Sequence, residues 1–283
     1  MIYKNERFEE ERALYGARDV ILENCAFEGE ADGESALKES EGVLAKDTRF
    51  ALRYPLWHAV GVRLDRCELT ETCRAPLWYA RSVAIKDCRI RGVKAVRECG
   101  DVCLTNVDCE SAEFAWRSRS LVINGGTLSG EYAFFESRGI KISGLSFRGK
   151  YAFQYAEGVE IKNAVLNTKD AFWHAKNVTV TDSVIEGEYL GWYAENIRFV
   201  RCTLRGTQPL CYAKGVILED CIMENASLAF EKSEVSGSVL GRIDSIKALG
   251  AGTLTCDACG EILPENDGSL GFGTVIVRKK EEA

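Results

Sequence analysis

The side chains of this chain that are best suited to ligand recognition recur at regular intervals, in two adjacent positions. All five tryptophans and both histidines occupy these positions, as Trp57-His58, Trp78-Tyr79, Trp116-Arg117, Trp173-His174 and Trp192-Tyr193. Indole and phenol rings offer flat apolar faces, while imidazole and hydroxyl groups at their edges form hydrogen bonds. Sugar rings present apolar C–H faces bordered by hydroxyls. These residue types therefore favour a carbohydrate-binding surface made by Trp57, His58, Trp78, Tyr79, Trp116, Trp173, His174, Trp192 and Tyr193.

A structural role is the alternative for the same residues, because stacked rings stabilise neighbouring turns of a repeat and their polar tips need only reach water. The position before the tryptophans is mostly apolar, as in Leu56 and Phe172, and has the better claim to the core. Ala115 and Gly191 argue the other way, since they are small where the next residue is a tryptophan. We expect the tryptophans to point outward and to be at least partly exposed.

Glu98, Arg117 and Glu136 continue the histidine and tyrosine position in three successive copies, and they are weak candidates for catalysis. Carboxylates two copies apart would be separated by about 10 Å, slightly more than inverting glycosidases use. A ladder of alternating charge, worth about a few tenths of a kcal/mol per rung, is the favoured explanation. The sequence also lacks a nucleophile elbow and a nucleotide-binding loop. We favour a protein without catalytic activity; the enzymatic alternative is a lyase or hydrolase of polysaccharides or oligosaccharides.

Cys256 and Cys259 have the spacing of half a zinc site. A structural zinc site needs four ligands, usually from two such pairs, and the sequence holds no second pair. We therefore expect a turn at this position, with no bound metal and no cofactor.

The ligand-recognition positions belong to a repeat that predicts the fold. Branched or long aliphatic residues recur as anchors, and nine of the eleven intervals between them are 19 residues. The anchors are Val20, Val43, Val62, Val83, Val102, Leu121, Ile140, Val159, Val178, Ile197, Val216 and Val235. A short fixed period of this kind is typical of a stacked-repeat architecture.

Within each copy, apolar and polar residues alternate as they do in strands with one buried face. The residue before each anchor is of a type that adopts left-handed backbone angles easily or bonds its own backbone. These residues are Asp19, Gly42, Gly61, Ser82, Asp101, Ser120, Gly139, Gly158, Asn177, Asn196 and Gly215. Three strands and three turns per copy predict an all-β fold, a parallel β-helix. We expect right-handed winding, because the hexapeptide repeat of left-handed helices is absent.

The repeat predicts eleven to twelve coils over residues 19–235. We expect residues 1–18 to form an N-terminal cap, with a short helix over Glu6 to Ala17, and residues 236–283 to form a C-terminal cap. Open coil ends expose unpaired strand edges, which must be covered. With four prolines and no linker, the whole chain 1–283 is predicted to be a single domain.

Composition excludes several classes of partner. The net charge of −7 argues against nucleic acid, which binds basic surfaces. No apolar run approaches the ~18 residues of a membrane span, and the N-terminus has no apolar signal segment. We therefore expect a cytoplasmic protein with no membrane partner.

The twelve cysteines are predicted to be free thiols. Cys25, Cys67, Cys88, Cys202 and Cys221 share one small-residue core position. Buried cysteine behaves there as a small hydrophobic residue, and side chains on successive rungs of a parallel coil point the same way. A reducing compartment fits the same conclusion.

The 19-residue coils, the Trp-His-Ala and Trp-Tyr-Ala steps and the stretch Ile243-Asp244-Ser245-Ile246 resemble an uncharacterised bacterial family, a domain of unknown function that spans essentially the whole chain. The resemblance implies a single-stranded right-handed β-helix of the pectin-lyase-like shape. Many proteins of that shape act on acidic polysaccharides. Their calcium-binding or paired catalytic aspartates are not recognisable in this sequence, so their activity does not carry over.

Two functional hypotheses remain. The first is a β-helix that recognises a glycan through its aromatic positions. The second is a non-catalytic scaffold whose flat faces dock another protein or a second copy of the same chain, as a homo-oligomer, since exposed aromatic stripes also mark protein interfaces.

Overall fold

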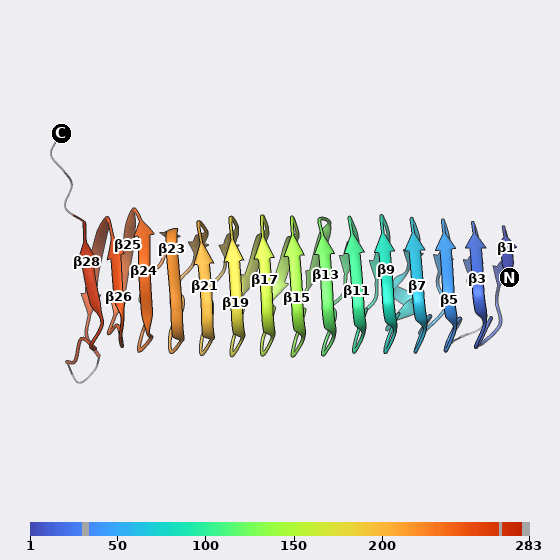
Figure 1. Cartoon of the computed structure of the whole chain (residues 1–283), viewed down its shortest axis with the longest axis horizontal. Helices are drawn as coiled ribbons and strands as arrows, with labels where there is room; N and C mark the ends of the chain where they lie inside the picture. Colours follow the sequence, from blue (N-terminus) through green and yellow to red (C-terminus); the bar gives the residue numbers. More distant parts are fainter. Residues whose placement is uncertain (30–33, 266–267, 279–283) are drawn as a thin grey trace. The chain divides into compact units, whose positions relative to one another are not determined.

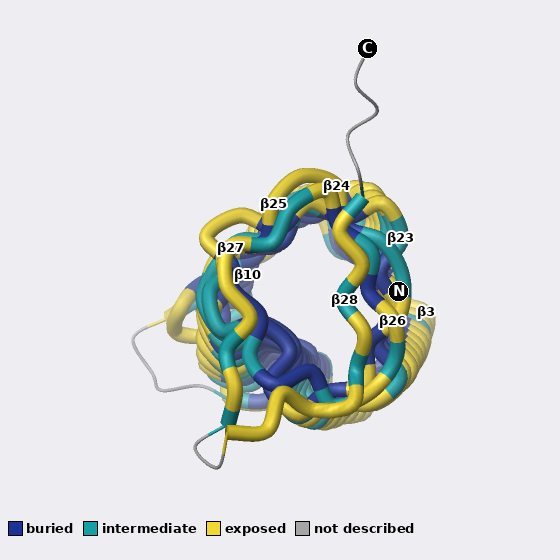
Figure 2. The backbone as a smooth tube through the Cα atoms, turned by 90° about the vertical axis from the view of Figure 1, so that its left-hand side faces the viewer, coloured by how far each residue is buried: buried dark blue, intermediate teal, exposed yellow. Residues whose placement is uncertain are grey.

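The computed structural model describes all residues except 30–33, 266–267 and 279–283. The chain divides into two compact units, Met1–Ser146 and Phe147–Ala283. In each unit, short parallel strands follow one another coil by coil (Figure 1). Buried positions line the inside of the coils, and exposed positions lie on the outside (Figure 2).

The first unit repeats a long strand followed by a shorter one. Its long strands are β1 (Ile2–Lys4), β3 (Arg18–Glu23), β5 (Glu41–Lys46), β7 (Val60–Asp65), β9 (Arg81–Lys86), β11 (Gly100–Thr105), β13 (Arg119–Asn124) and β15 (Arg138–Ser143). Its shorter strands are β2 (Arg7–Phe8), β4 (Ala26–Phe27), β6 (Arg49–Phe50), β8 (Glu68–Leu69), β10 (Arg89–Arg91), β12 (Asp108–Glu110) and β14 (Thr127–Gly130). β16 (Ser146–Lys150) begins at the last residue of this unit.

The second unit continues the same pattern. One set of parallel strands is β17 (Glu157–Lys162), β19 (Lys176–Thr181), β21 (Glu195–Val200), β23 (Lys214–Glu224), β24 (Val235–Leu240), β26 (Thr253–Cys256) and β28 (Thr274–Val277). The other strands are β18 (Val165–Lys169), β20 (Val184–Glu186), β22 (Thr203–Arg205), β25 (Arg242–Lys247) and β27 (Ala258–Leu263). β23 is long enough to pair with both β21 and β22.

The 19-residue register predicted from the anchors is confirmed inside each unit. Val83 pairs with Val102 in the first unit, and Val159 pairs with Val178 in the second. The longer interval between Val62 and Val83 keeps the same pairing, because the extra residues are accommodated in a loop that contains the 3-10 turn η1 (Glu71–Cys73). The parallel β-helix is therefore set by anchors that are all buried.

The residues before the anchors adopt the left-handed backbone angles that their types predict. All eleven residues that precede the anchors from Val20 to Val216 have φ between 50° and 69°. Glycine, asparagine and aspartate reach these angles at little cost, which explains their choice at this position.

The predicted coil count and both caps need correction. Residues 1–18 form a coil, because β1 pairs with β3 and β2 pairs with β4, and no helix covers Glu6 to Ala17. Residues after 235 add the strands β25 to β28. Among the described residues, fifteen strands lie in the series from β1 to β28, which corresponds to about 14 turns, not eleven to twelve. The right-handed winding stays a prediction.

The 19-residue offset is lost in the C-terminal coils. In the C-terminal coils, Gly237 pairs with Leu254 and Leu254 pairs with Val275, so the offsets between partners are no longer 19 residues. A search for a constant interval misses coils of this kind.

At the N-terminus the offset of 19 is kept, since Tyr3 pairs with Leu22 and Phe8 pairs with Phe27. The inward positions there are held by the half-buried Tyr3 and Phe8 and by the small residues Ala13 and Ala17, which lack the branched or long aliphatic side chain of the anchors.

All twelve cysteines are free thiols in the structure, as predicted, and ten of them are buried. Among the described residues, no helix has the length and apolarity needed to span a bilayer.

Candidate functional site

The tryptophans and the residues that follow them form one corner of the coils. We call the two positions the tryptophan column and the ring-edge column, and the two together the aromatic corner. In the first unit, the tryptophan column is Lys38, Trp57, Trp78, Arg97, Trp116 and Phe135, and the ring-edge column is Glu39, His58, Tyr79, Glu98, Arg117 and Glu136. In the second unit, the columns are Gln154, Trp173, Trp192 and Cys211, and Tyr155, His174, Tyr193 and Tyr212.

The backbone of the aromatic corner is fixed by hydrogen bonds to both neighbouring coils. Every residue of the ring-edge column has φ between 52° and 61°. The N–H of His58 donates to the carbonyl of Trp78 in the next coil (3.0 Å), whereas the N–H of Leu56 donates to Ala36 in the previous coil (2.8 Å). Because these backbone hydrogen bonds do not depend on the side chain, the residue types at the corner can differ from coil to coil.

The tryptophans are half-buried, in agreement with the prediction that they are partly exposed. Most of their indole N–H groups point into the fold. Trp57 donates to the carbonyl of Ala75 (2.7 Å), and Trp192 donates to that of Gln208 (2.7 Å). Trp116 and Trp173 make equivalent bonds to the carbonyls of Tyr132 (2.6 Å) and Tyr189 (3.1 Å). The tryptophan column therefore fastens neighbouring coils, which is the structural role considered from the sequence.

Trp78 is the exception, because its buried indole nitrogen has no hydrogen-bond partner among the described residues. The guanidinium of Arg97 lies 4.8 Å from the Trp78 ring centre and 4.9 Å from that of Trp116. Arg97 thus takes the place of a ring between two tryptophans, a cation–π arrangement. Its Nη1 donates to Glu113 (2.8 Å), and its Nε lies 3.5 Å from Glu98.

The weak catalytic candidates lie on the ring-edge column of the first unit and have partners there. Arg117 donates to Glu136 (2.6 Å), and this bond raises the pKa of the Arg117 guanidinium. Glu98 forms an ion pair with Arg97 rather than with Arg117. The three residues are adjacent, as predicted, but their charges are neutralised locally. Their catalytic role stays a prediction.

In the first unit, His58 and Tyr79 form a stacked pair. Their ring centres are 4.8 Å apart and their planes make an angle of 17°. Tyr79 also stacks against Trp78 (5.5 Å, 23°), while Trp57 meets Trp78 edge-on (5.2 Å, 72°). His58 and Tyr79 remain exposed at their edges.

The second unit extends the same pairing into a ladder of four rings. Tyr155, His174, Tyr193 and Tyr212 are successive, with ring centres 4.9, 5.0 and 5.1 Å apart. The angles between successive planes are 8°, 8° and 14°. Rings that lie face to face cover one another's faces, so His174 and Tyr193 present their edges to solvent. These edges carry the imidazole nitrogen and the phenol hydroxyl.

The ladder ends at a buried carboxylate. Glu231 is 8% exposed and accepts hydrogen bonds from Lys247 (3.0 Å) and from the Tyr212 hydroxyl. Burial raises the pKa of Tyr212 to about 12, and the hydrogen bond to Glu231 acts in the same direction. The next residue of the ring-edge column is Lys232, because the coil is one residue longer and Phe230 has moved into the buried column.

The sequence as a whole decides the family of this chain. Residues 1–272 match the family model described as "Protein of unknown function (DUF3737)". The chain belongs to the DUF3737 family. This confirms the resemblance noted from the repeat and from the Trp-His-Ala and Trp-Tyr-Ala steps. No curated protein matches the DUF3737 chain.

Among solved structures, the DUF3737 chain is similar to the catalytic domain of a GH87 alpha-1,3-glucanase in complex with nigerose. The identity is 8% and the TM-score 0.34, and the match covers 100% of this chain and 64% of the other. A variant of that domain in complex with tetrasaccharides matches at 8% identity and a TM-score of 0.29, with the same coverage. The DUF3737 chain thus spans less than two thirds of the length of these chains.

Open depressions on the first unit of the DUF3737 chain lie away from the aromatic corner. One of about 410 Å³ is lined by residues around Arg91 and Glu110, and another of about 440 Å³ is lined by residues around Arg49 and Glu28. Both include Glu71, in the 3-10 turn. The arginines are already bonded to neighbouring carboxylates, so these depressions offer no unpaired cation.

Cys256 is buried in β26, and Cys259 is half-buried in β27. They lie on two consecutive strands, and the chain bends between them at Asp257, in agreement with the turn expected at this position. Across the described part of the chain, no three histidine, cysteine, aspartate or glutamate side chains form a group that could hold a metal ion.

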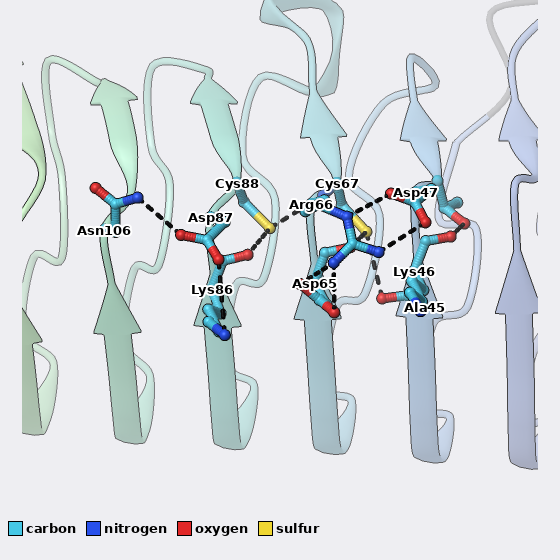
Figure 3. A network of polar contacts seen from close by, with 11 residues as sticks. Ala45, Lys46, Asp47, Asp65, Arg66, Cys67, Lys86, Asp87, Cys88 and Asn106 are labelled. Carbon is cyan, nitrogen blue, oxygen red and sulfur yellow. Dashed lines mark hydrogen bonds and ion pairs between the residues drawn. The ribbon is translucent and has the colours of Figure 1, made fainter.

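Sequence reasoning missed a second ladder, at the turn that follows each long strand. Its residues have φ between 50° and 70°, and most are aspartate, asparagine or glycine: Asn5, Asn24, Asp47, Arg66, Asp87, Asn106, Gly125, Gly144, Asn163, Asp182, Arg201 and Asp220. Asp47 accepts two hydrogen bonds from Arg66 (2.8 and 2.9 Å), and Asn106 donates to Asp87 (2.7 Å), as Figure 3 shows. The recurrence of aspartate, asparagine and glycine at this position in successive copies of the repeat could have revealed the ladder.

Proposed function

We propose that this protein is a non-catalytic binding module that recognises an oligosaccharide along its aromatic corner. The observation that carries the proposal is the pair of stacked rings His174 and Tyr193, which recurs as His58 and Tyr79. In both pairs the hydrogen-bonding edges face solvent and the ring faces are covered. The surface is therefore rigid before any ligand arrives, and little conformational entropy is lost on binding.

Hydrogen bonding at the ring edges suits a sugar chain. Tyr193 is 42% exposed and Tyr79 is 39% exposed, and neither hydroxyl has a hydrogen-bond partner among the described residues. Phenol and imidazole groups both donate and accept, as sugar hydroxyls do. This differs from the contact expected from the sequence, in which sugar faces would stack on exposed indole faces, because the tryptophans use their N–H groups and much of their area within the fold.

The partners of the catalytic candidates support binding over catalysis. Glu136 is bonded to Arg117, and Glu98 is paired with Arg97, so neither carboxylate is held ready as an acid or base. The depressions of the first unit lie at other residues. The proposal therefore assigns no reaction to the aromatic corner.

The scaffold hypothesis has one observation in its favour. On the outer face of the long strands in the first unit, Leu44 and Val122 are exposed (40% and 37%) at equivalent positions. A flat face with apolar side chains also suits a second copy or another protein. This alternative involves a different surface, so the two hypotheses can be tested independently.

The test begins with an array of oligosaccharides of varied linkage and charge, followed by titration calorimetry with the best ligand. The double variant Tyr79→Phe/Tyr193→Phe removes two hydroxyls and leaves the stacks in place. Each lost hydrogen bond contributes about 0.5–1.5 kcal/mol, so the affinity should fall at least about fivefold. Tyr3→Phe, at a half-buried tyrosine outside the corner, is the matched control and should bind as the wild type does.

Two results would reject the proposal. One is the absence of any ligand on the array. The other is a ligand whose affinity is unchanged in the double variant. If the protein instead elutes as a dimer that Leu44→Lys and Val122→Lys convert to a monomer, the scaffold alternative is favoured.

A further inference from the structure

Resting on the proposed function, we propose that the oligosaccharide binds along the four-ring ladder of the second unit, Tyr155, His174, Tyr193 and Tyr212. The ligand is an uncharged oligosaccharide of about four sugar units, one for each ring of the ladder. The stacked pair His58 and Tyr79 in the first unit is not an equivalent binding site. The difference lies in what borders each His–Tyr pair.

The length of the ladder sets the length of the ligand. Its four rings are spaced 4.9, 5.0 and 5.1 Å apart, close to the spacing of the strands that carry them. An extended sugar chain advances by a similar distance per ring. A ligand lying along the ladder therefore meets a ring edge at each sugar unit, and the Tyr212 hydroxyl, which donates to Glu231, keeps its oxygen as an acceptor.

The ladder has a defined end. The Tyr212 hydroxyl is already bonded to Glu231, whose other partner is Lys247. The next ring-edge residue, Lys232, lies 3.5 Å from Glu265. Rings stop at this point and charged pairs begin, so sugar units beyond the ladder gain no further contact of the same kind.

The ladder contains no aspartate, glutamate, lysine or arginine side chain that could select a charged sugar. The starts of the neighbouring long strands carry alternating charges, Glu157, Lys176, Glu195 and Lys214, and Lys176 and Glu195 form an ion pair at 3.1 Å. Gln154, a neutral residue, begins the adjoining tryptophan column of this unit. The two lysines and two glutamates sum to zero, so in a chain with a net charge of −7 this surface offers no net positive charge to an acidic polysaccharide.

The equivalent pair in the first unit is bordered by charged residues. Glu39 accepts a hydrogen bond from Tyr15 (2.7 Å), and Glu98 is paired with Arg97. His58 and Tyr79 thus form two rungs between carboxylates that already have partners, and a sugar chain placed there would meet a ring edge at only two positions.

The experiment measures affinity against ligand length and charge. Neutral oligomers of the best array ligand, from two to eight units, are titrated against the full chain. Affinity should rise with each added unit and level off at about four units. The same oligomers oxidised to carboxylates at their primary hydroxyls should bind at least tenfold more weakly at low salt, because the acidic protein repels them.

Single variants locate the site. Tyr193→Phe should lower the affinity about two- to tenfold, and the matched change Tyr79→Phe in the first unit should lower it by a clearly smaller factor. Thermal unfolding of both variants checks that the stacks are intact. Equal losses in the two variants, tighter binding of the oxidised oligomers, or an affinity that stops rising at two units would each overturn this inference while leaving glycan binding itself established. Absence of all binding would instead reject the proposed function.

Discussion

The imidazole of His174 and the phenol of Tyr193 lie parallel, with ring centres 5.0 Å apart and an angle of 8° between their planes. Successive coils place equivalent side chains one strand spacing apart, which is close to the distance at which flat rings stack. The repeat therefore stacks these rings without any special packing. The consequence for recognition is that ring edges, and not ring faces, are available to a ligand.

Trp57 and Trp78 provide a matched pair for the structural role of the tryptophan column. Substitution by phenylalanine removes the indole N–H from both. Trp57 loses a hydrogen bond to the carbonyl of Ala75, whereas Trp78 has no such bond to lose. We expect Trp57→Phe to lower the free energy of unfolding by about 1 kcal/mol more than Trp78→Phe does. Urea unfolding measures the difference, and equal losses would show that the bond contributes nothing.

The planar guanidinium of Arg97 is predicted to stabilise the fold. It lies between the rings of Trp78 and Trp116 and is bonded to Glu113. Arg97→Lys keeps the charge but loses the flat group that contacts both rings. We expect the variant to be less stable by about 1 kcal/mol, the size of a partly buried cation–π contact. Arg117→Lys, at an exposed arginine of the neighbouring column, is the control and should change the free energy of unfolding by less than about 0.5 kcal/mol. Equal losses of stability in the two variants would contradict a stabilising role for the contact of Arg97 with the two tryptophan rings.

The positions that could be predicted from the sequence are those where the backbone restricts the residue type. The residues before the anchors, such as Gly61 and Asn177, must adopt left-handed angles, and their types reveal this directly. The buried anchors reveal the coil spacing in the same way. The ring-edge column also has left-handed angles, but its residues, such as Tyr79 and Arg117, give no sign of it. Hydrogen bonds to both neighbouring coils hold the backbone there, so the side chain is not selected for its conformation.

The orientation of the rings could not be predicted for a related reason. Identical columns are compatible with rings that face outward and with rings that stack, since both place an aromatic residue at each 19-residue interval. The pairing of Glu231 with Lys247 could not be predicted from a constant interval either, because the coil between Leu210 and Phe230 is one residue longer and moves the later residues by one column.

Thiol accessibility follows from burial. Cys103 and Cys259 are half-buried, and the other ten cysteines are buried. Burial raises the pKa of Cys73 to about 12 and that of Cys99 to about 12, so these thiols hold their protons at neutral pH. A thiol reagent should therefore label at most Cys103 and Cys259 in the native protein and all twelve after denaturation without reductant. Rapid labelling of Cys73 in native protein would contradict the burial.

Asp170 and Asp182 are predicted to act on stability in opposite directions as the pH changes. Hydrogen bonding from Arg201 lowers the pKa of Asp182, so its charged form is favoured in the folded state. Its contribution is present above the unfolded pKa of about 3.9 and is lost as the pH falls through the lower folded value. Asp170 is 6% exposed, and burial raises its pKa, so its charged form is disfavoured in the folded state.

Replacement by asparagine separates the two effects. At pH 7, Asp170→Asn removes a buried charge and should raise the free energy of unfolding, on the order of 1 kcal/mol. The gain should shrink as the pH falls toward the unfolded pKa of about 3.9, where the native carboxyl is already protonated. Asp182→Asn should lower stability at pH 7 and should show less further loss on acidification than the wild type. Thermal unfolding between pH 7 and pH 3 measures both. Since the two substitutions remove the same charge, a shared sign of their effects at pH 7 would show that net charge, and not the local environment of each carboxylate, controls the stability of these coils.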